Sequence, residues 1–421
     1  MIRYKNRNFA NPVAAGFAGI IVYILILFLS PTTITLNVEG IALGFVILSY
    51  LMFFFGATFA MKAKVATVRP LFLASGRRRQ RFHLATAAII SIITTVYDRF
   101  VARGASFSGD FLESREAIAS IGSTPAGILG ALLLPAVYLY LFETYRARNA
   151  GEKVFRLQVP FSILLVFAHP AIGLIFGSRS TLLSSMFFLF AFSIYFRRTK
   201  INWWVTCKLI IAGFVFALLL GYLFLQRLEV MNMLAVYSVK YSVYASMIQP
   251  NNAAMGWLED DQGSFMFLLI FSFVNLAQYY THGLLELLYQ VSHETEITHS
   301  YGAYLLYIPY KMIGMFVALP DVFQKIAAAK MTLGAYTSFF GPVHSDFGWF
   351  SLLFMLLFGY YSGRIYKISV VTLDYVPLSI LLLATAFFFP VVNFLLLGPN
   401  FYAFVGFTAF AIWNRRIYGK Y

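Results

Sequence analysis

Apolar residues continue almost without interruption for about twenty positions at a time along much of this 421-residue chain. A helix needs about 20 residues to cross a hydrocarbon core that is roughly 30 Å thick. Strands of an outer-membrane barrel would alternate apolar with polar residues, and these runs do not alternate. The pattern therefore predicts an all-α, polytopic membrane protein.

Ten of these runs are predicted to be transmembrane helices. They cover residues 13–30, 40–61, 83–98, 125–143, 158–177, 181–196, 203–225, 347–365, 376–396 and 400–414. The long segment 226–346 separates the seventh run from the eighth, and it contains two further apolar stretches, 264–278 and 301–319. These two stretches either cross the membrane, which gives twelve helices, or lie at its interface. No internal repeat or Pro- or Gly-rich linker divides the chain, so 1–421 is predicted to form one transmembrane domain.

Composition supports the membrane prediction, because 60% of the residues are hydrophobic and only 12% are charged. A soluble domain of this length could not bury so much apolar surface. The single cysteine, Cys207, excludes an internal disulfide framework. Arg3, Lys5 and Arg7 precede the first run, but no small-x-small cleavage site follows them, so we expect an uncleaved first helix.

The distribution of charge predicts the orientation. With the N-terminus inside, the inner segments contain 23 of the 32 lysines and arginines, and the outer segments contain 14 of the 17 acidic residues. Cationic loops are retained in the cytoplasm, so both termini are expected there and the segment 226–346 outside. A cytoplasmic 281–300 would contain no lysine or arginine, which favours the interfacial alternative. The net charge of +15 then faces anionic lipid, and nucleic-acid binding is not expected.

The predicted spans contain few ionisable groups in their interiors. His169, which precedes Pro170 in the fifth span, is the clearest exception, and a simple proline kink is favoured over a functional role as its explanation. Ion-coupled transporters usually need buried Asp, Glu or Lys along their pathway, so this scarcity counts against transport.

Three of the arginines predicted to lie on the outer side, against the general charge bias, stand apart as candidates. Arg179 stands in the short turn Gly177-Ser178-Arg179-Ser180, and Arg103 and Arg115 lie between the third and fourth spans. Arg179 could instead reach lipid phosphates at the interface, and Arg115 could form a surface ion pair with its flanking glutamates. Arginine binds pyrophosphate through paired hydrogen bonds and stays charged, so the three are candidate pyrophosphate ligands.

Histidines concentrate in the outer segment, which makes it a candidate catalytic region. His282 and Glu286 are four residues apart, so a helix would place them on one face, where the carboxylate could orient the imidazole as a general base. His299 is the alternative base, and His293 and His344 lie in the same segment. Their spacing fits no zinc signature, so no metal site is predicted, and each could also be a solvated loop histidine.

Asp346 is a further candidate at the entry to the eighth span. It lies in His344-Ser345-Asp346-Phe347-Gly348, after a Gly- and aromatic-rich stretch from Gly334 to Gly341 that could shape a sugar cleft. The alternative is structural, because an aspartate at this position could cap the N-terminus of the following helix.

These motifs together resemble the O-antigen polymerase family, also called oligosaccharide repeat-unit polymerases. The resemblance rests on four short stretches that are spread over most of the chain. They are Gly177-Ser178-Arg179-Ser180, the Asp98–Arg115 loop with Arg103-Gly104, Tyr280–Tyr304, and Gly341–Gly363 with Asp346-Phe347-Gly348.

The resemblance implies a GT-C-like glycosyltransferase of the bacterial inner membrane, related in architecture to the O-antigen ligases. Such enzymes polymerise undecaprenyl-pyrophosphate-linked repeat units at the periplasmic face, for O-antigen, capsule or exopolysaccharide. Carried onto this chain, the resemblance assigns the donor pyrophosphate to Arg179, Arg103 and Arg115. It assigns proton transfer to His282, Glu286, His299 or Asp346, without metal or other cofactor. The expected partners are lipid-linked glycans, the bilayer and a chain-length regulator. The alternatives are an O-antigen-ligase-like transferase and a flippase or transporter of lipid-linked sugars.

Overall fold

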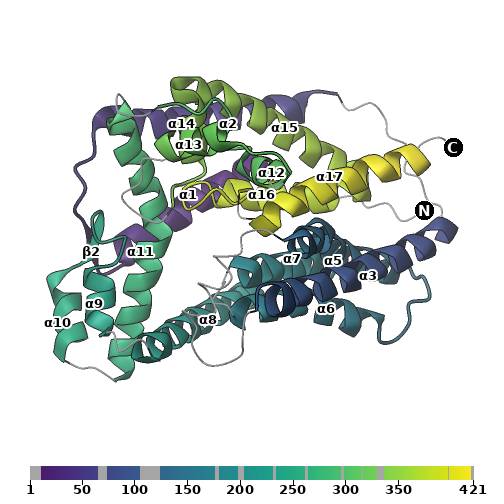
Figure 1. Ribbon diagram of the computed structural model, residues 1–421, viewed down its shortest axis with the longest axis horizontal. Coiled ribbons are helices and arrows are strands. Elements are labelled where there is room, and N and C mark those ends of the chain that lie inside the picture. The colour runs from purple at the N-terminus through teal and green to yellow at the C-terminus, as the bar shows by residue number, and fades with distance from the viewer. Residues whose placement is uncertain are drawn as a thin grey trace.

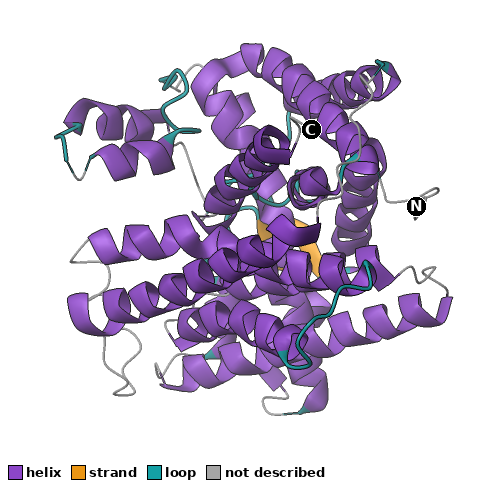
Figure 2. Ribbon diagram, turned by 90° about the vertical axis from the view of Figure 1, so that its right-hand side faces the viewer, coloured by secondary structure: helices purple, strands orange, loops and turns teal. Residues whose placement is uncertain are grey.

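The computed structural model describes residues 11–64, 74–104, 124–175, 180–197, 203–230, 234–260, 264–294, 298–314, 316–329, 336–396 and 398–418. The protein is all-α and 80% helical, which confirms the predicted class. Among the described residues, one pair of three-residue strands interrupts the helices (Figure 2). These strands, β1 (Thr32–Ile34) and β2 (Ile248–Pro250), pair antiparallel and tie the segment after the first helix to the region around residue 250.

The helices follow most of the predicted runs. In chain order they are α1 (Pro12–Leu29), α2 (Gly40–Lys62), α3 (Ala74–Val96), α5 (Pro125–Asn149), α6 (Gln158–Ile175), α7 (Ser180–Arg197), α8 (Trp203–Val230), α9 (Ala235–Lys240), α10 (Asn252–Asp260), α11 (Phe265–Ser292), α12 (Tyr307–Ile313), α13 (Pro320–Ala329), α14 (Phe340–Phe347), α15 (Ser351–Val371), α16 (Val376–Phe387) and α17 (Gly398–Tyr418). Short helical turns of other types complete them: η1 (Tyr97–Ala102), η3 (Gly348–Phe350) and η4 (Leu373–Tyr375).

Four of the described helices are long and apolar enough to cross a membrane. They cover Pro12–Leu29, Gly40–Lys62, Arg77–Ala102 and Pro125–Asn149, and coincide with the first four predicted spans. Many large apolar side chains on α1 and α2 are exposed, among them Phe28 and Phe55. Exposed apolar surface of this extent is expected where lipid replaces water. These helices suggest a multi-pass membrane protein, and the total of ten spans stays a prediction.

Two of the predicted apolar segments do not form one long helix in the structure. The run 376–396 is helical only through Phe387, since Pro390 cannot donate a backbone hydrogen bond and disfavours helix at the residue before it. The stretch 301–319 contains the seven-residue helix α12, whose rise of about 10 Å is too short to cross a bilayer. The interfacial alternative for 301–319 therefore fits the structure better than a crossing.

Two groups of helices form separate apolar cores. In one core, α3, α5, α6 and α7 pack with α16 and α17 around Val137, Phe188 and Phe407. In the other, α1, α2, α11 and α14 pack with α15 around Phe53 and Phe389. The helices α15 and α16 contact both groups and each other, so they join the two cores.

Glycines allow α2 and α15 to approach each other closely. An added Cβ at Gly359 would lie 2.1 Å from the Phe53 carbonyl oxygen, and one at Gly363 would lie 2.4 Å from that of Ala57. Only residues without a side chain permit this backbone contact, which is a common mode of helix association in membranes. The packing fixes α15 against α2 and thereby positions the segment that precedes α15.

The helices give the molecule two distinct ends. One end, which we call the terminal end, is where α17 finishes (Figure 1). There the end of α5 meets η4 and the end of α17. At the opposite side of the same view, α11 stands upright across the ends of the other long helices, and β2, α9 and α10 lie beside it (Figure 1). We call this second region the α11 end. α11 is one continuous helix that is longer than the predicted apolar stretch 264–278.

Candidate functional site

The predicted site residues fall into two described clusters and one undescribed group. Arg179 and Arg115 lie outside the described residues. Arg103 belongs to a cluster where α3 ends, whereas His282, Glu286, His299 and Asp346 belong to the α11 end. η1 packs against α3 and α5, and α11 packs against α1, α2, α8 and α14. The predicted pyrophosphate ligand and the predicted bases therefore stand on different helix groups.

The arginine cluster consists of Asp98, Arg99, Arg103 and Thr124. α3 continues into the π-helical turn η1, which contains Asp98 and Arg99, and Arg103 is the residue at which this turn ends. The buried Asp98 carboxylate lies 3.0 Å from Nε of Arg103 and 3.6 Å from Nε of Arg99, and it also accepts a hydrogen bond from the Thr124 hydroxyl. π-Helical turns inside helices often mark functional sites.

The same cluster adjoins the N-terminus of α5. The Thr124 hydroxyl caps this helix by accepting a hydrogen bond from the backbone N–H of Gly127 at 3.0 Å. An added Cβ at Gly127 would lie 2.8 Å from the Asp98 carboxylate, so the glycine is what lets the carboxylate approach. The positive charge of two guanidinium groups and of a helix N-terminus exceeds the negative charge of one carboxylate. The cluster is therefore suited to bind an anion.

His169 lies beside this cluster, on α6. Its Nε2 is 3.1 Å from the Thr95 hydroxyl, which itself donates to the Ser91 carbonyl at 2.8 Å. The imidazole donates to this hydroxyl or accepts from it, according to its tautomer. The contact ties α6 to the last turn of α3, close to where η1 begins.

His282 is fully buried on α11 among aromatic side chains. Its Nδ1 lies 3.4 Å from the Tyr279 carbonyl, and its Nε2 accepts a hydrogen bond from the backbone N–H of Tyr336 at 3.3 Å. The ring lies edge-on to Tyr336 with 3.9 Å between centroids. Backbone groups therefore hold both ring nitrogens, in place of the Glu286 carboxylate that the spacing suggested. A proton can reach Nε2 only if the Tyr336 contact opens.

Glu286 and Asp346 are both fully buried near Tyr304. Burial, together with the Asp346 and then the Glu286 carboxylate, raises the pKa of the Tyr304 phenol to about 12. The Asp346 carboxylate accepts hydrogen bonds from the backbone N–H groups of Tyr304 at 3.0 Å and Leu305 at 2.9 Å, and from the Ser300 hydroxyl. It therefore holds the turn 298–306 in place.

The expectation that Asp346 caps the helix after it is wrong. Asp346 lies in the last turn of α14, and Gly348, with φ +54°, ends that helix. Phe350 occupies the N-cap position of α15, and its side chain makes no capping hydrogen bond. Glycine adopts a left-handed backbone conformation easily, so the chain can turn at Gly348 between α14 and α15. Asp346 therefore contacts the turn 298–306 and not the start of α15.

Sequence reasoning missed an ion network at the terminal end. Nη1 of Arg146 lies 2.6 Å from the Asp374 carboxylate and 3.0 Å from that of Glu143, and Nη1 of Arg81 lies 2.7 Å from Glu152. Asn414 donates to Asp374 at 3.2 Å. Burial raises the pKa of Asp374, against the opposing effects of Arg77 and the Asn414 hydrogen bond. The network joins α3, α5, η4 and α17. Except for Glu143 and Arg146, which are three residues apart, its partners are too far apart in the sequence to be paired by inspection.

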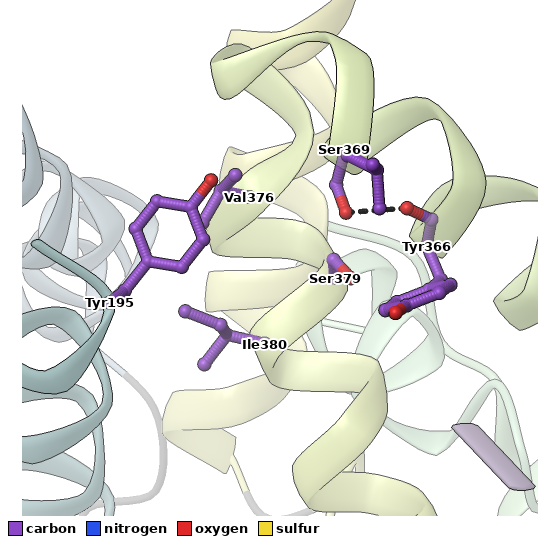
Figure 3. Close-up of a pocket in the computed structure, with 7 residues that line it drawn as sticks. Tyr195, Tyr366, Ser369, Val376, Ser379 and Ile380 are labelled. Carbon is purple, nitrogen blue, oxygen red and sulfur yellow. Dashed lines mark hydrogen bonds between the residues drawn. The ribbon is translucent and has the colours of Figure 1, made fainter. Parts of the chain in front are cut away.

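A small pocket opens between α7, α15 and α16, away from both predicted clusters. Figure 3 shows its lining, in which the Ser369 hydroxyl donates to the Tyr366 carbonyl at 2.7 Å. The other lining residues are Tyr195, Val370, Val376, Ser379 and Ile380. None of the lining residues is a cation, so this pocket is a poor site for a phosphate group.

The chain matches no family model, and no curated protein or solved structure matches it either. The likeness to repeat-unit polymerases therefore rests on the sequence motifs alone. Its implications for activity, substrate and partners remain predictions.

Proposed function

We propose that this protein is an inner-membrane glycosyltransferase that polymerises undecaprenyl-pyrophosphate-linked oligosaccharide repeat units at the periplasmic face. The product would be an O-antigen, a capsule or an exopolysaccharide. The proposed topology has ten transmembrane helices with both termini in the cytoplasm, so the terminal end faces the cytoplasm. The α11 end then lies at the periplasmic boundary, with α11 and α12 at the interface.

The observation that carries the proposal is the arginine cluster. Arg99 and Arg103 meet the N-terminus of α5 at the end of α3 that lies away from the terminal end. The length of α3 places this cluster about 30 Å from the ion network, which is roughly the thickness of a hydrocarbon core. A lipid pyrophosphate carries its charge at that depth, and paired guanidinium groups bind it bidentately.

The separation of the two clusters fits a repeat-unit substrate. The acceptor carries its pyrophosphate at one end of the oligosaccharide and its attacking hydroxyl at the other. Arg99 and Arg103 would hold the acceptor's pyrophosphate, while a base at the α11 end meets the far sugar. The donor pyrophosphate would fall to Arg179 and Arg115.

The proposed chemistry is a glycosyl transfer. The acceptor hydroxyl oxygen bonds to the anomeric carbon of the donor, and the bond from that carbon to the pyrophosphate oxygen breaks. His299, which is half-buried, is the more accessible base for the hydroxyl proton, and His282 would serve only after its Tyr336 contact opens. Undecaprenyl pyrophosphate leaves with the bonding electrons, and cations at the donor site stabilise that charge.

The test is complementation in a strain that lacks the native gene. Replacing Arg103 alone would leave the buried Asp98 carboxylate with less compensation, so the decisive variant is Asp98→Asn/Arg103→Ala, compared with Asp98→Asn alone. We expect the double variant to bind the acceptor's pyrophosphate more weakly and so to lose long-chain glycan by about ten-fold or more at normal protein level. Arg78→Ala, an exposed cation on the same helix at the terminal end, is the matched control. Normal polymer from the double variant would reject the role of the cluster.

A flippase of lipid-linked sugars is the second candidate, and one observation favours it. The buried pair Glu143–Arg146 stands inside α5, and buried charges are frequent along transport pathways. Lipid analysis of the deletion strain separates the alternatives. Loss of a polymerase leaves single repeats on the final acceptor, loss of a flippase leaves them on the cytoplasmic leaflet, and loss of a ligase leaves polymer on the lipid carrier.

A further inference from the structure

Four side chains at the α11 end surround a single glycine. Nε2 of His344 lies 3.7 Å from Oε1 of Glu294, and the rings of His299 and His344 are 6.4 Å apart between centroids. The indole of Trp349 donates to Oε2 of Glu294 at 2.7 Å. These side chains come from the end of α11, the turn after it, α14 and η3. We call the group of Glu294, His299, His344 and Trp349 the Gly348 site.

Gly348 makes room for the arrangement. Its backbone is left-handed, and a Cβ added there would lie 3.0 Å from Oε1 of Glu294 and 3.0 Å from Nε2 of His299. A side chain at this position would therefore strain the backbone and require the carboxylate and the imidazole to shift. The glycine lets these two polar groups approach the same stretch of backbone.

His344 adds an imidazole that makes no hydrogen bond to the described residues. Its side chain is fully buried beside the Phe45 ring, and neither ring nitrogen has a hydrogen-bond partner among the described residues. Burial, helped by the neighbouring His299, lowers the pKa of His344 to about 4, so the ring is neutral at physiological pH. A neutral imidazole has one donor and one acceptor, and leaving them unmade costs about 1–3 kcal/mol each. A ligand with hydroxyl groups would satisfy both kinds of group.

Trp349 supplies an aromatic surface in a fixed orientation. Its ring is held by Glu294 and by an edge contact to Phe45 at 5.4 Å, and 37% of the residue remains exposed. Tyr301, whose φ of 51° is unusual for a residue with a side chain, lies exposed on the turn that Asp346 holds. Rigid aromatic faces beside hydrogen-bonding groups suit a pyranose ring, whose C–H face is apolar and whose hydroxyls are polar.

We propose that the Gly348 site binds a sugar ring of the glycan, on the acceptor side of the reaction. This proposal rests on the proposed function for the identity of its ligand. The Glu294 carboxylate disfavours a phosphate group, so the two clusters divide one substrate between them. The arginine cluster takes the anionic end, and the Gly348 site takes an uncharged sugar at the other end.

Binding measurements on the purified full-length protein in detergent test the proposal separately from activity. One probe is the free oligosaccharide repeat unit, released from the cell's own glycan without lipid or phosphate, and the other is undecaprenyl pyrophosphate without sugar. We expect Trp349→Ala and Gly348→Ala to weaken oligosaccharide binding by about ten-fold or more and to leave undecaprenyl pyrophosphate binding unchanged. Asp98→Asn/Arg103→Ala should do the reverse.

Phe350→Ala is the matched control, because Phe350 is the adjacent aromatic and is 81% exposed. Gly348→Ala strains the backbone at a left-handed position. If the melting temperature of that variant falls, the binding of oligosaccharide by Trp349→Ala and Glu294→Gln decides whether the site binds sugar. Oligosaccharide binding that is absent in the wild type, or equal in Trp349→Ala and wild type, would overturn the sugar site. A protein that binds the oligosaccharide at Trp349 but never lengthens lipid-linked repeats would support this site and refute the polymerase.

Discussion

The terminal end and the α11 end bury different kinds of polar group. At the terminal end, full charges pair directly, with Arg146 2.6 Å from Asp374 and Arg81 2.7 Å from Glu152. At the α11 end, neutral imidazoles, hydroxyls and amides lie beside carboxylates. Single atoms at both ends, such as Oε2 of Glu143, find no partner among the described residues, but His344 lacks a partner at both of its ring nitrogens. Ion pairs fix helices against one another, whereas a neutral ring without hydrogen bonds leaves capacity for a ligand.

This difference indicates which end can change its partners. Removing one member of a buried ion pair leaves an uncompensated charge, so such a network has little freedom to rearrange. Separating a neutral polar group from its partners costs less free energy than separating a charge, and a substrate hydroxyl can then satisfy the neutral group. We therefore expect substitutions at the terminal end to act mainly on stability, and those at the α11 end to act mainly on binding.

The largest expected effect is from Arg146→Ala at the terminal end. The substitution removes the cation that pairs directly with Glu143 and Asp374 and leaves Arg77 as the remaining buried cation that acts on Asp374, and breaking a buried ion pair costs up to about 3–5 kcal/mol. The melting temperature of the protein in detergent should fall strongly. Arg148→Ala, an exposed arginine on the same helix, should leave it unchanged. Equal melting temperatures for both variants would show that the network does not lock the helices.

Acid should destabilise the α11 end through His344. Its pKa is about 4 in the folded protein against an ordinary value of 6.5, so the unfolded chain takes up the proton first. Stability should therefore fall as the pH drops from 6.5 to 4, by at most about 3 kcal/mol, and level off below. Glu294 and His299 face the ring, so the measurement compares wild type with His344→Asn to isolate the contribution of His344. The variant should show a shallower slope, and the exposed-residue control His83→Asn should keep the wild-type slope.

Asp346→Asn should loosen the turn 298–306 without unfolding the helices. The neutral amide is a weaker acceptor for the backbone N–H groups of Tyr304 and Leu305, and charge-assisted bonds contribute about 1.5–3 kcal/mol. Hydrogen exchange at these two amides should accelerate by about ten-fold or more. Asp321→Asn, an exposed aspartate on α13, is the control. Unchanged exchange would mean that other contacts hold the turn.

The sequence predicts the long helices well but not the contacts between them. α11 shows why: Gln278 interrupts the apolar run that was expected to end there, yet the helix continues to Ser292. The Gln278 amide donates to the carbonyls of Val239 and Ile248, so a tertiary contact satisfies a polar group that hydropathy counts against a helix. Likewise, the partner of His282 is the backbone of Tyr336, 54 positions away, and no spacing rule identifies it.

The smallest expected effect concerns the arginine cluster, which combines features of both ends. Thr124→Val removes the cap of α5 and one hydrogen bond to Asp98, at a cost of about 1 kcal/mol. The melting temperature should fall only slightly, while binding of undecaprenyl pyrophosphate should weaken because Asp98 no longer holds both arginines in place. A large loss of stability with unchanged binding would make this cluster a structural lock like the ion network.

Extension of lipid-linked repeat units by the purified protein tests the central claim most directly. Wild-type protein in detergent, supplied with undecaprenyl-pyrophosphate-linked single repeats and no nucleotide sugar, should produce a ladder of longer glycans. Asp98→Asn/Arg103→Ala should extend the repeats more slowly, by about ten-fold or more, at the same melting temperature. Single repeats that remain unextended by folded wild-type protein, from a strain whose cells make long polymer with it, would contradict the account.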